Sequence, residues 1–274
     1  SLLEHTQEGN ENKDNYTIEK DTGVHYGKLF ENFSYSQFKE AQKLLESRIR
    51  RNGIPIDSIK NKIILDQGCG GGRYTIALKM LGAKKVIGLD FSKIGIENAI
   101  SRCKHYGIKN VEFIEGSVLK MPFEDNIFDF VFSNGVLHHT NNWTLGLREQ
   151  LRVLKKGGMG FLYLIENPGG IFWDSVEILR FLNKNTNKSF ARNTLATLGI
   201  PNNRIFYMLD HVLVPINTRL KPEEIENQLI KEKANNIRRL KRGTDFDRVE
   251  YLYKGKSNGY DLFGVGENRY IFTK

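Results

Sequence analysis

The sequence is poor in cysteine and has no long apolar run. Cys69 and Cys103 are its only cysteines, which is too few for a disulfide framework or for a zinc site built from cysteines. We therefore expect both to be reduced thiols. No apolar stretch approaches the roughly 18 residues that a membrane-spanning helix needs, and no charged and then apolar signal segment opens the chain. These absences predict a cytoplasmic protein with no membrane span.

Acidic residues are outnumbered, and the formal net charge of the 274 residues is +9. Part of the excess is local, because one acid, Glu232, opposes six cations: Lys231, Lys233, Arg238, Arg239, Lys241 and Arg242. Nucleic acid is one partner that such a cluster can serve, and a solvated face is the other interpretation. Proteins that bind single-stranded nucleic acid combine cations with stacking aromatic residues, and none interrupts this cluster. The pattern favours the solvated face without excluding nucleic acid.

A strand, a glycine-rich turn and a helix follow one another from Lys62 onward. A β-prone run ends in Asp66, glycines stand at positions 68, 70, 71 and 72, and a helix-compatible run from Tyr74 closes at Gly82. Glycine lets backbone N–H groups approach a ligand, and the helix N-terminus adds positive potential. The turn therefore suits a ligand with an anionic end, although a tight turn without a ligand can carry the same glycines.

Strands and helices alternate through the rest of the first 165 residues. The patterns predict strands at 85–90, 111–114, 128–133 and 159–165, with residues 155–158 as a turn. A helix capped by Ser34 or Ser36 precedes the glycine turn and runs to about residue 51. Two more cover 93–106, with Ser92 as cap, and 143–154. This alternation predicts a parallel sheet covered by helices on both faces.

The alternation stops beyond Glu166. Helical patterns cover 171–182, 190–198, 202–213 and 222–231, and strands are predicted at 237–241 and 268–273, with a polar loop at 254–259. The stretch from about 167 to 220 is too long for a simple crossover, which indicates a helical insertion or lid. We therefore divide the chain into an N-terminal flap and helix (1–58), a core (59–166), a helical insertion or lid (167–233) and C-terminal strands that complete the sheet (234–274).

Polar residues follow four of the predicted strands where each strand ends: Asp66, Asp90, Ser117 and Asn134. An open α/β sheet binds its ligands at the carboxyl ends of its strands. An acid at the end of the second strand can accept hydrogen bonds from both hydroxyls of a ribose. A lone acid at a strand end is more often a helix cap, so Asp90 alone decides little.

Five motifs in order resemble those of class I S-adenosylmethionine-dependent methyltransferases. They are Asp66-x-Gly-x-Gly-x-Gly, Gly-Leu-Asp-Phe-Ser around Asp90, Glu-Gly-Ser-Val…Met-Pro-Phe at 115–123, Phe-Asp…Asn…His-His at 128–139, and Leu-Arg-Val-Leu-Lys-Lys-Gly-Gly at 151–158. The glycine turn alone is a weak signal, and the five together are a strong one. The resemblance, close over about 60–166, implies a Rossmann-like, mostly parallel sheet of seven strands with the last antiparallel.

The resemblance also implies a cofactor, S-adenosylmethionine, and residues that hold it. The glycine turn would run along the methionine part, Asp90 would hold the ribose hydroxyls, and the residues after the third strand would meet the adenine edge. Phe91 would lie against the adenine, and Asn134 would contact the methionine end. The positions so implied are Asp66, Gly68, Cys69, Gly70, Asp90, Phe91, Ser117, Val118, Asn134 and Gly135.

Two positions test this resemblance. Many relatives carry an aspartate where this chain has Ser117, which can still hydrogen-bond the adenine amino group, but more weakly. A nicotinamide dehydrogenase would need a third glycine where this chain has Arg73. A bulky side chain there would obstruct close packing of helix on strand, so the spacing favours the methyltransferase.

Methyl transfer from a sulfonium needs alignment, exclusion of water and, for a protonated nucleophile, removal of a proton. That scheme requires no metal. His138 and His139 follow the fourth strand, and histidine titrates near neutral pH. Either could be the general base, or one could pack beneath the cofactor while the other shapes the loop. Tyr26 in the N-terminal flap is a weaker catalytic candidate.

The methyl acceptor depends on the lid, which the family resemblance does not cover. Aromatic residues there, Phe172, Trp173, Phe181, Phe206 and Tyr207 with Met208, either line a pocket for a small organic molecule or form the lid's own core. Arg204 and Arg219 either pair with an acidic group of that molecule or are surface charges. Three functions stay open: methyl transfer to oxygen, nitrogen or carbon of a small-molecule metabolite or natural product, methyl transfer to RNA or protein, and cofactor binding without catalysis.

Overall fold

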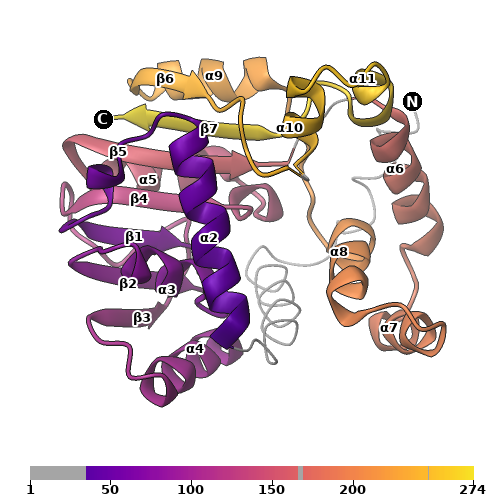
Figure 1. The fold of residues 1–274 in the computed structure, drawn as a ribbon, viewed down its shortest axis with the longest axis horizontal. Coiled ribbons are helices and arrows are strands. Elements are labelled where there is room, and N and C mark those ends of the chain that lie inside the picture. Colours follow the sequence, from indigo (N-terminus) through magenta and orange to yellow (C-terminus); the bar gives the residue numbers. More distant parts are fainter. Residues whose placement is uncertain (1–34, 166–168, 246) are drawn as a thin grey trace.

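A seven-stranded sheet forms the centre of the molecule in a computed structural model that describes residues 35–165, 169–245 and 247–274. The strand order is β3-β2-β1-β4-β5-β7-β6 (Figure 1). The strands are β1 (Ile63–Gln67), β2 (Lys85–Asp90), β3 (Val111–Glu115), β4 (Phe128–Asn134), β5 (Leu154–Leu164), β6 (Asn235–Arg239) and β7 (Asn268–Thr273). The first five are parallel to one another, whereas β7 is antiparallel to both β5 and β6. The predicted Rossmann-like, mostly parallel sheet is confirmed.

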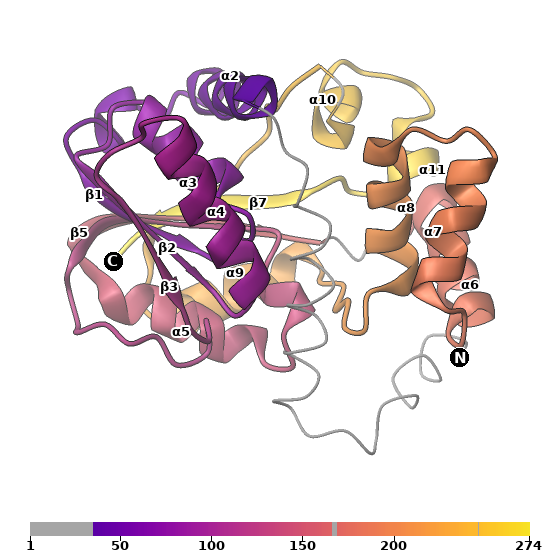
Figure 2. The same cartoon turned by 90° about the horizontal axis from the view of Figure 1, so that it is seen from below.

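Helices cover both faces of the sheet, as Figure 2 shows. On one face lie α2 (Tyr35–Arg51), α3 (Arg73–Met80) and α4 (Lys93–His105), and on the other lie α5 (Trp143–Val153) and α9 (Pro222–Lys231). Successive strand residues face opposite sides, so Ile64 packs under α2 and α3 while its neighbour Leu65 joins the opposite core. A strand buried on both sides must be apolar throughout, which explains the uninterrupted apolar runs in the sequence.

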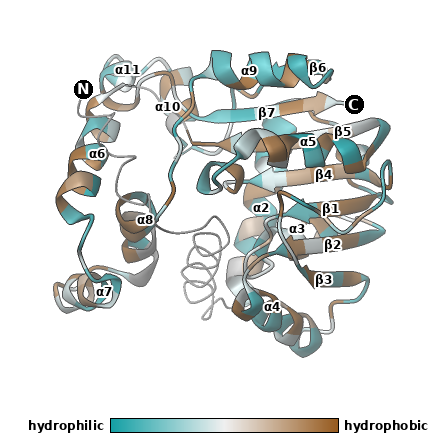
Figure 3. Cartoon of the chain, turned by 180° about the vertical axis from the view of Figure 1, so that it is seen from behind, coloured by the Kyte–Doolittle hydropathy of each residue, from teal (hydrophilic) through white to brown (hydrophobic). Residues whose placement is uncertain are grey.

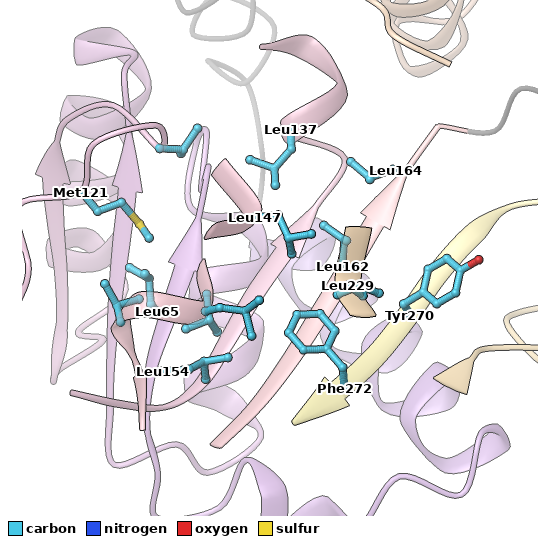
Figure 4. Packing of buried hydrophobic residues seen from close by; sticks show 14 of the residues in the cluster. Leu65, Met121, Leu137, Leu147, Leu154, Leu162, Leu164, Leu229, Tyr270 and Phe272 are labelled. Atoms are coloured by element: carbon cyan, nitrogen blue, oxygen red, sulfur yellow. The ribbon is translucent and has the colours of Figure 1, made fainter. Parts of the chain in front are cut away.

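The larger core lies between the sheet and the pair α5 and α9. Leu65, Leu147 and Phe272 are among its fully buried members, and Figure 4 shows them packed together. Ile225 and Leu229 of α9 belong to the same core. This helix therefore packs on the sheet and not with the other helices that follow β5.

Local signals set the helix ends. The Ser92 hydroxyl accepts the N–H of Gly95 at 3.2 Å, which confirms it as the cap of α4. The Asn142 side chain does the same for Leu145 at 3.0 Å and begins α5. Helix α2 ends before Gly53, whose φ of 63° is the left-handed conformation that glycine adopts most easily.

Two predicted local elements differ from the structure, and two short helices were not predicted. Residues 155–158 belong to β5 and not to a turn, because the pairing of β5 with β4 shifts register there and because the Gly157 N–H donates to the Lys274 carbonyl at 2.9 Å. Strand β6 begins two residues before its predicted start, at Asn235. Helices α10 (Arg248–Tyr253) and α11 (Gly259–Phe263) are too short to show an apolar repeat, and the sequence patterns missed both.

The helices α6 (Ile171–Asn183), α7 (Lys188–Thr197) and α8 (Asn202–Leu213) stand together beyond the carboxyl ends of the strands. We call these three helices the lid. Their bounds agree with the predicted patterns to within two residues. None of the helices in the described ranges combines the length and the hydropathy that crossing a membrane requires.

Candidate functional site

The glycine turn joins β1 to α3 and is held against the end of β2. The backbone N–H groups of Gly68 and Cys69 both donate to the Leu89 carbonyl, at 2.8 and 3.0 Å. Gly68 has a φ of 81°, and a Cβ at this position would lie 2.3 Å from a methyl group of Val136. Only glycine satisfies both conditions, so the turn brings bare backbone to the ends of β1 and β4.

Asp90 closes one side of this turn. Its Oδ2 accepts the N–H of Gly70 at 2.7 Å, and its Oδ1 accepts the N–H of Ser92 at 2.8 Å. The Phe91 backbone N–H also hydrogen-bonds this carboxyl, and a carboxylate has about four acceptor positions, so Asp90 retains acceptor capacity. Burial raises the pKa of this carboxyl above its ordinary value. The predicted ribose acceptor therefore lies within hydrogen-bond distance of the predicted cofactor turn.

Asp66 lies at the end of β1, and only 2% of its surface is exposed. The Thr75 hydroxyl donates to its Oδ2 at 2.6 Å. Burial raises the pKa of this carboxyl to about 7, against the lowering effect of the hydrogen bond from Thr75. A cation placed beside Asp66 would drive it to the ionised form.

The residues predicted to meet the adenine lie beyond the ends of β2 and β3. Phe91 and Ser117 are half-buried, and Val118 is buried. The Ser117 hydroxyl accepts the N–H of Leu119 at 3.1 Å. These positions lie with Asp90 at the carboxyl ends of β2 and β3.

Asn134 and Gly135 end β4 on the other side of the glycine turn. The Gly135 N–H donates to the Tyr163 carbonyl of β5 at 3.1 Å, and its φ of 76° requires glycine. A Cβ at Gly135 would lie 3.6 Å from the Tyr163 ring. Tyr163, which the sequence analysis did not select, therefore lies beside the predicted methionine position.

His138 and His139 are both buried and have different hydrogen bonds. The His138 Nδ1 accepts the N–H of Ile165 at 3.1 Å, so the proton of its neutral ring is on Nε2. The His139 Nδ1 lies 2.8 Å from the Ile216 carbonyl. A carbonyl can only accept, so the His139 Nδ1 donates and its Nε2 carries the lone pair. Burial lowers the pKa of both rings, well below the ordinary value in His138.

Comparison with known proteins identifies the domain that holds these residues. Residues 58–193 match a family model described as a methyltransferase domain. This chain carries a class I methyltransferase domain. The seven-stranded sheet with an antiparallel β7 agrees with that assignment, which confirms the family predicted from the motifs.

Curated relatives match this methyltransferase domain over part of their length. A demethylmenaquinone methyltransferase of Staphylococcus haemolyticus is 41% identical over 97 residues, which are 35% of this chain and 40% of that protein. One of Bacillus pumilus is 32% identical over 148 residues, 51% of this chain and 62% of that protein. The chain thus spans less than two thirds of the length of these relatives.

Solved structures share the fold of the whole chain. A candidate S-adenosylmethionine-dependent methyltransferase of Methanococcus maripaludis is 20% identical, covers 96% of each chain and has a TM-score of 0.52. The [4+2]-cyclase SpnF is 16% identical, covers 85% of this chain and 79% of its own, and has a TM-score of 0.51. At these identities the likeness concerns the fold. The cyclase demonstrates that the fold can serve another reaction.

Glycine packing explains the departure at Arg73 from the dinucleotide pattern. A Cβ at Gly72 would lie 2.9 Å from Ala99 and 2.9 Å from the Phe113 ring. The glycine that brings helix close to strand is therefore residue 72, one position earlier than in a dinucleotide fingerprint. Arg73 begins α3 with its guanidinium 4.7 Å from the Tyr74 ring. It causes none of the obstruction that the dehydrogenase pattern would suffer.

Sequence reasoning missed a buried charge network beside the methyltransferase site. Asp247 accepts from Arg48 of α2 at 3.1 Å and from Arg269 of β7 at 3.0 Å, and all three side chains are buried. Arg48 also donates to the Tyr74 hydroxyl at 3.2 Å, and the Arg269 guanidinium lies 4.8 Å from the Tyr163 ring. The Arg48–Asp247 contact joins residues 199 positions apart along the chain, for which no local sequence pattern exists.

Gln67 is a second missed residue, and it ties two loops to the end of β1. The side chain is completely buried, and its Nε2 donates to the Gly146 carbonyl at 3.0 Å and to the Val118 carbonyl at 3.4 Å. A polar residue between Asp66 and Gly68, at the end of a buried strand, was a signal that could have drawn attention to it.

The lid candidates divide between core and surface. Trp173 is 1% exposed and packs with Ile165, so it belongs to the lid's own core. The Arg219 guanidinium lies 4.3 Å from the Trp173 ring and forms an ion pair with Glu177, so it is not a surface charge. Phe172, Phe181 and Met208 are exposed, as is Arg204. The side chains of Phe206 and Tyr207, and all of Tyr26, lie outside what the structure describes.

Proposed function

We propose that this chain is an S-adenosylmethionine-dependent methyltransferase that acts on an oxygen, nitrogen or carbon nucleophile of a small organic molecule. The hydrogen bond from the Gly70 N–H to Asp90 carries the proposal, because it joins the ribose acceptor to the glycine turn. Curated relatives named for demethylmenaquinone support a small organic acceptor. The fold alone would not support methyl transfer to such an acceptor, because the [4+2]-cyclase SpnF shares this fold.

The residues present fit the proposed cofactor. Asp90 retains acceptor capacity for the ribose hydroxyls beside its backbone hydrogen bonds. Asp66 presents a buried carboxyl beside the glycine turn, where the ammonium of a methionine group would ionise it. When bound, S-adenosylmethionine supplies a methyl group activated by a positively charged sulfur. The protein has to align the nucleophile with that methyl and to exclude water.

His139 is the better candidate for the general base. Its Nε2 carries the lone pair in the neutral ring, whereas in His138 that nitrogen carries the proton. Burial lowers the pKa of His139, so the ring is neutral and able to accept a proton at physiological pH. We assign His138 the structural role, because its ring holds the N–H of Ile165 at the end of β5.

Two measurements test the proposal. Calorimetric titration with S-adenosylhomocysteine measures cofactor binding, and transfer of a labelled methyl group to separate small-molecule, RNA and protein fractions identifies the acceptor. We expect binding, and label in the small-molecule fraction. Label in RNA that disappears with added salt would favour the second candidate, which the basic residues around Arg242 support. Binding without label in any fraction would favour a module without catalytic activity.

Matched histidine variants test the base once an acceptor is known. We expect His139→Gln to lower kcat by about 100-fold, within the range for loss of a general base, and His138→Gln to lower thermal stability more than kcat. The base must be unprotonated, so the wild-type rate should fall with decreasing pH and reach half its maximum below pH 6.5. An unchanged acidic limb in His139→Gln would contradict this role.

A further inference from the structure

A cationic cavity of about 360 Å³ lies outside the methyltransferase site. The end of α2, strand β6 with the residues after it, and α10 form its walls. Five of the lining residues are cations and one is a tyrosine: Arg51, Arg238, Arg239, Lys241, Arg242 and Tyr253. No acid lines it. The cavity thus collects most of the basic cluster that the sequence showed and that methyl transfer does not use.

Among the residues that the structure describes, acids neutralise one of these cations. Arg51 pairs with Asp245 at 3.0 Å and with Glu250 at 3.2 Å. The other four form no ion pair with any residue that the structure describes. Arg238 and Arg239 donate instead to backbone carbonyls, and Arg242 donates to the Tyr253 hydroxyl at 2.9 Å. Like charges held together repel one another, and a bound anion would relieve that repulsion.

Asn52 makes this arrangement a built site and not a loose surface. Its side chain is 8% exposed, and its Oδ1 accepts the backbone N–H groups of Lys241 and Arg242, both at 3.1 Å. Its Nδ2 donates to the Arg48 carbonyl at 2.9 Å and also to the Arg242 carbonyl. One buried amide therefore fixes the backbone that carries two of the cations. The Arg242 guanidinium, 4.4 Å from the Tyr253 ring, is held further by stacking.

We propose that this cavity binds the diphosphate or triphosphate group of a small molecule. Guanidinium groups match phosphate oxygens in paired hydrogen bonds, and lysine adds a point charge. The cations line one cavity, whereas a nucleic-acid strand needs a track of charges with aromatic faces for its bases. The aromatic residue here, Tyr253, stacks with Arg242. The proposal is independent of the methyl-transfer reaction.

Titration of the full chain with pyrophosphate and with ADP at about physiological salt tests this site. We expect pyrophosphate to bind, and Lys241→Gln with Arg242→Gln to weaken it tenfold or more. The matched control, Lys104→Gln with Lys109→Gln, removes two exposed charges from α4 and the loop after it and should change the affinity less than twofold. Circular dichroism and thermal melting check that both double variants fold.

The outcomes separate the sources of the phosphate. ADP binding tighter than pyrophosphate supports a nucleotide, and equal affinities support a free polyphosphate. Equal weakening in both double variants would show a diffuse charge effect and overturn the proposal. So would absence of pyrophosphate binding, or tighter binding of a labelled single-stranded RNA that only the cavity variant abolishes. S-adenosylhomocysteine binding in the same variants should stay unchanged, which keeps this site distinct from the methyltransferase site.

Discussion

The sheet and the lid bury their apolar residues very differently. On the sheet, both faces are covered, and residues such as Leu65 and Phe272 are at most 1% exposed. On α6 of the lid, Ile171, Ile178 and Leu182 are 64%, 55% and 69% exposed, and Figure 3 shows apolar segments along this helix. One turn of α6 faces the lid core through Trp173 while other turns expose apolar side chains. The sheet carries its own packing partners, whereas the lid's three helices leave much apolar surface uncovered.

The largest expected effect of this difference is on stability. Phe272→Ala should lower the free energy of unfolding by about 3–5 kcal/mol, because it opens a cavity in the closely packed core. Leu182→Ala, its counterpart on the lid, should change that free energy by less than about 0.5 kcal/mol, since the side chain is already in water. Urea denaturation followed by circular dichroism measures both. Similar losses would mean that Leu182 is covered in solution.

The second-largest expected effect is on cofactor affinity, which should depend on the sheet and not on the lid. Asp90→Ala removes the charged acceptor that would hold the two ribose hydroxyls. Two such hydrogen bonds contribute about 3 kcal/mol at the low end, so S-adenosylhomocysteine should bind about 100-fold more weakly. Asp57→Ala, which removes an exposed acid before β1, is the matched control and should have no effect. An affinity within a factor of three of the wild type would exclude Asp90 as the ribose acceptor. Titration calorimetry distinguishes these results.

The expected pH dependence of binding is a smaller effect, and it tests Asp66 at the carboxyl end of β1. Asp66 has a pKa of about 7 without ligand, and a cationic ligand favours its ionised form. Binding then releases a proton, so affinity for S-adenosylmethionine should rise with pH and level off above pH 7. From pH 6 to pH 8 the expected gain is about tenfold, and Asp66→Asn should abolish it. The same gain in Asp66→Asn would assign the proton to another group.

The smallest expected effect is on the lid side of the comparison. Leu179→Ser combined with Leu182→Ser makes the exposed face of α6 polar without touching Trp173. S-adenosylhomocysteine affinity should stay within twofold of the wild type, because every candidate cofactor residue lies at the carboxyl ends of the strands. A tenfold loss in the same titration would demonstrate that α6 contributes to cofactor binding and would remove the distinction between the two regions.

The sequence was sufficient for those parts of the fold that depend on local pattern. Buried strands such as β2 are continuous apolar runs, and Ser92 is a polar cap before a helical stripe, so both were predicted at the right residues. The cofactor candidates were predictable because they lie at strand ends, in motifs with fixed spacing. Their assignment to the cofactor stays a prediction, which the geometry of Asp90 and the glycine turn supports.

Long-range contacts explain what could not be predicted. The pairing of Arg48 with Asp247, and the turn that Asn52 organises around Lys241, join segments about 190–200 residues apart, and neither partner shows a local signal. The roles of the two histidines depend on Ile165, which directly follows β5, and on Ile216, which follows α8. Tyr163 became a site residue only when β5 was placed beside β4.

The position of β7 has a consequence for folding. This strand lies between β5 and β6, yet it is synthesised after both, so β6 has no neighbour in the sheet until β7 arrives. The edge of β5 that β7 later covers therefore stays unpaired while the ribosome adds more than a hundred residues. During that time another nascent chain can pair with it. Slow assembly of β7 with β6 should limit the yield of native protein. A chaperone that shields the exposed edge of β5 should raise that yield.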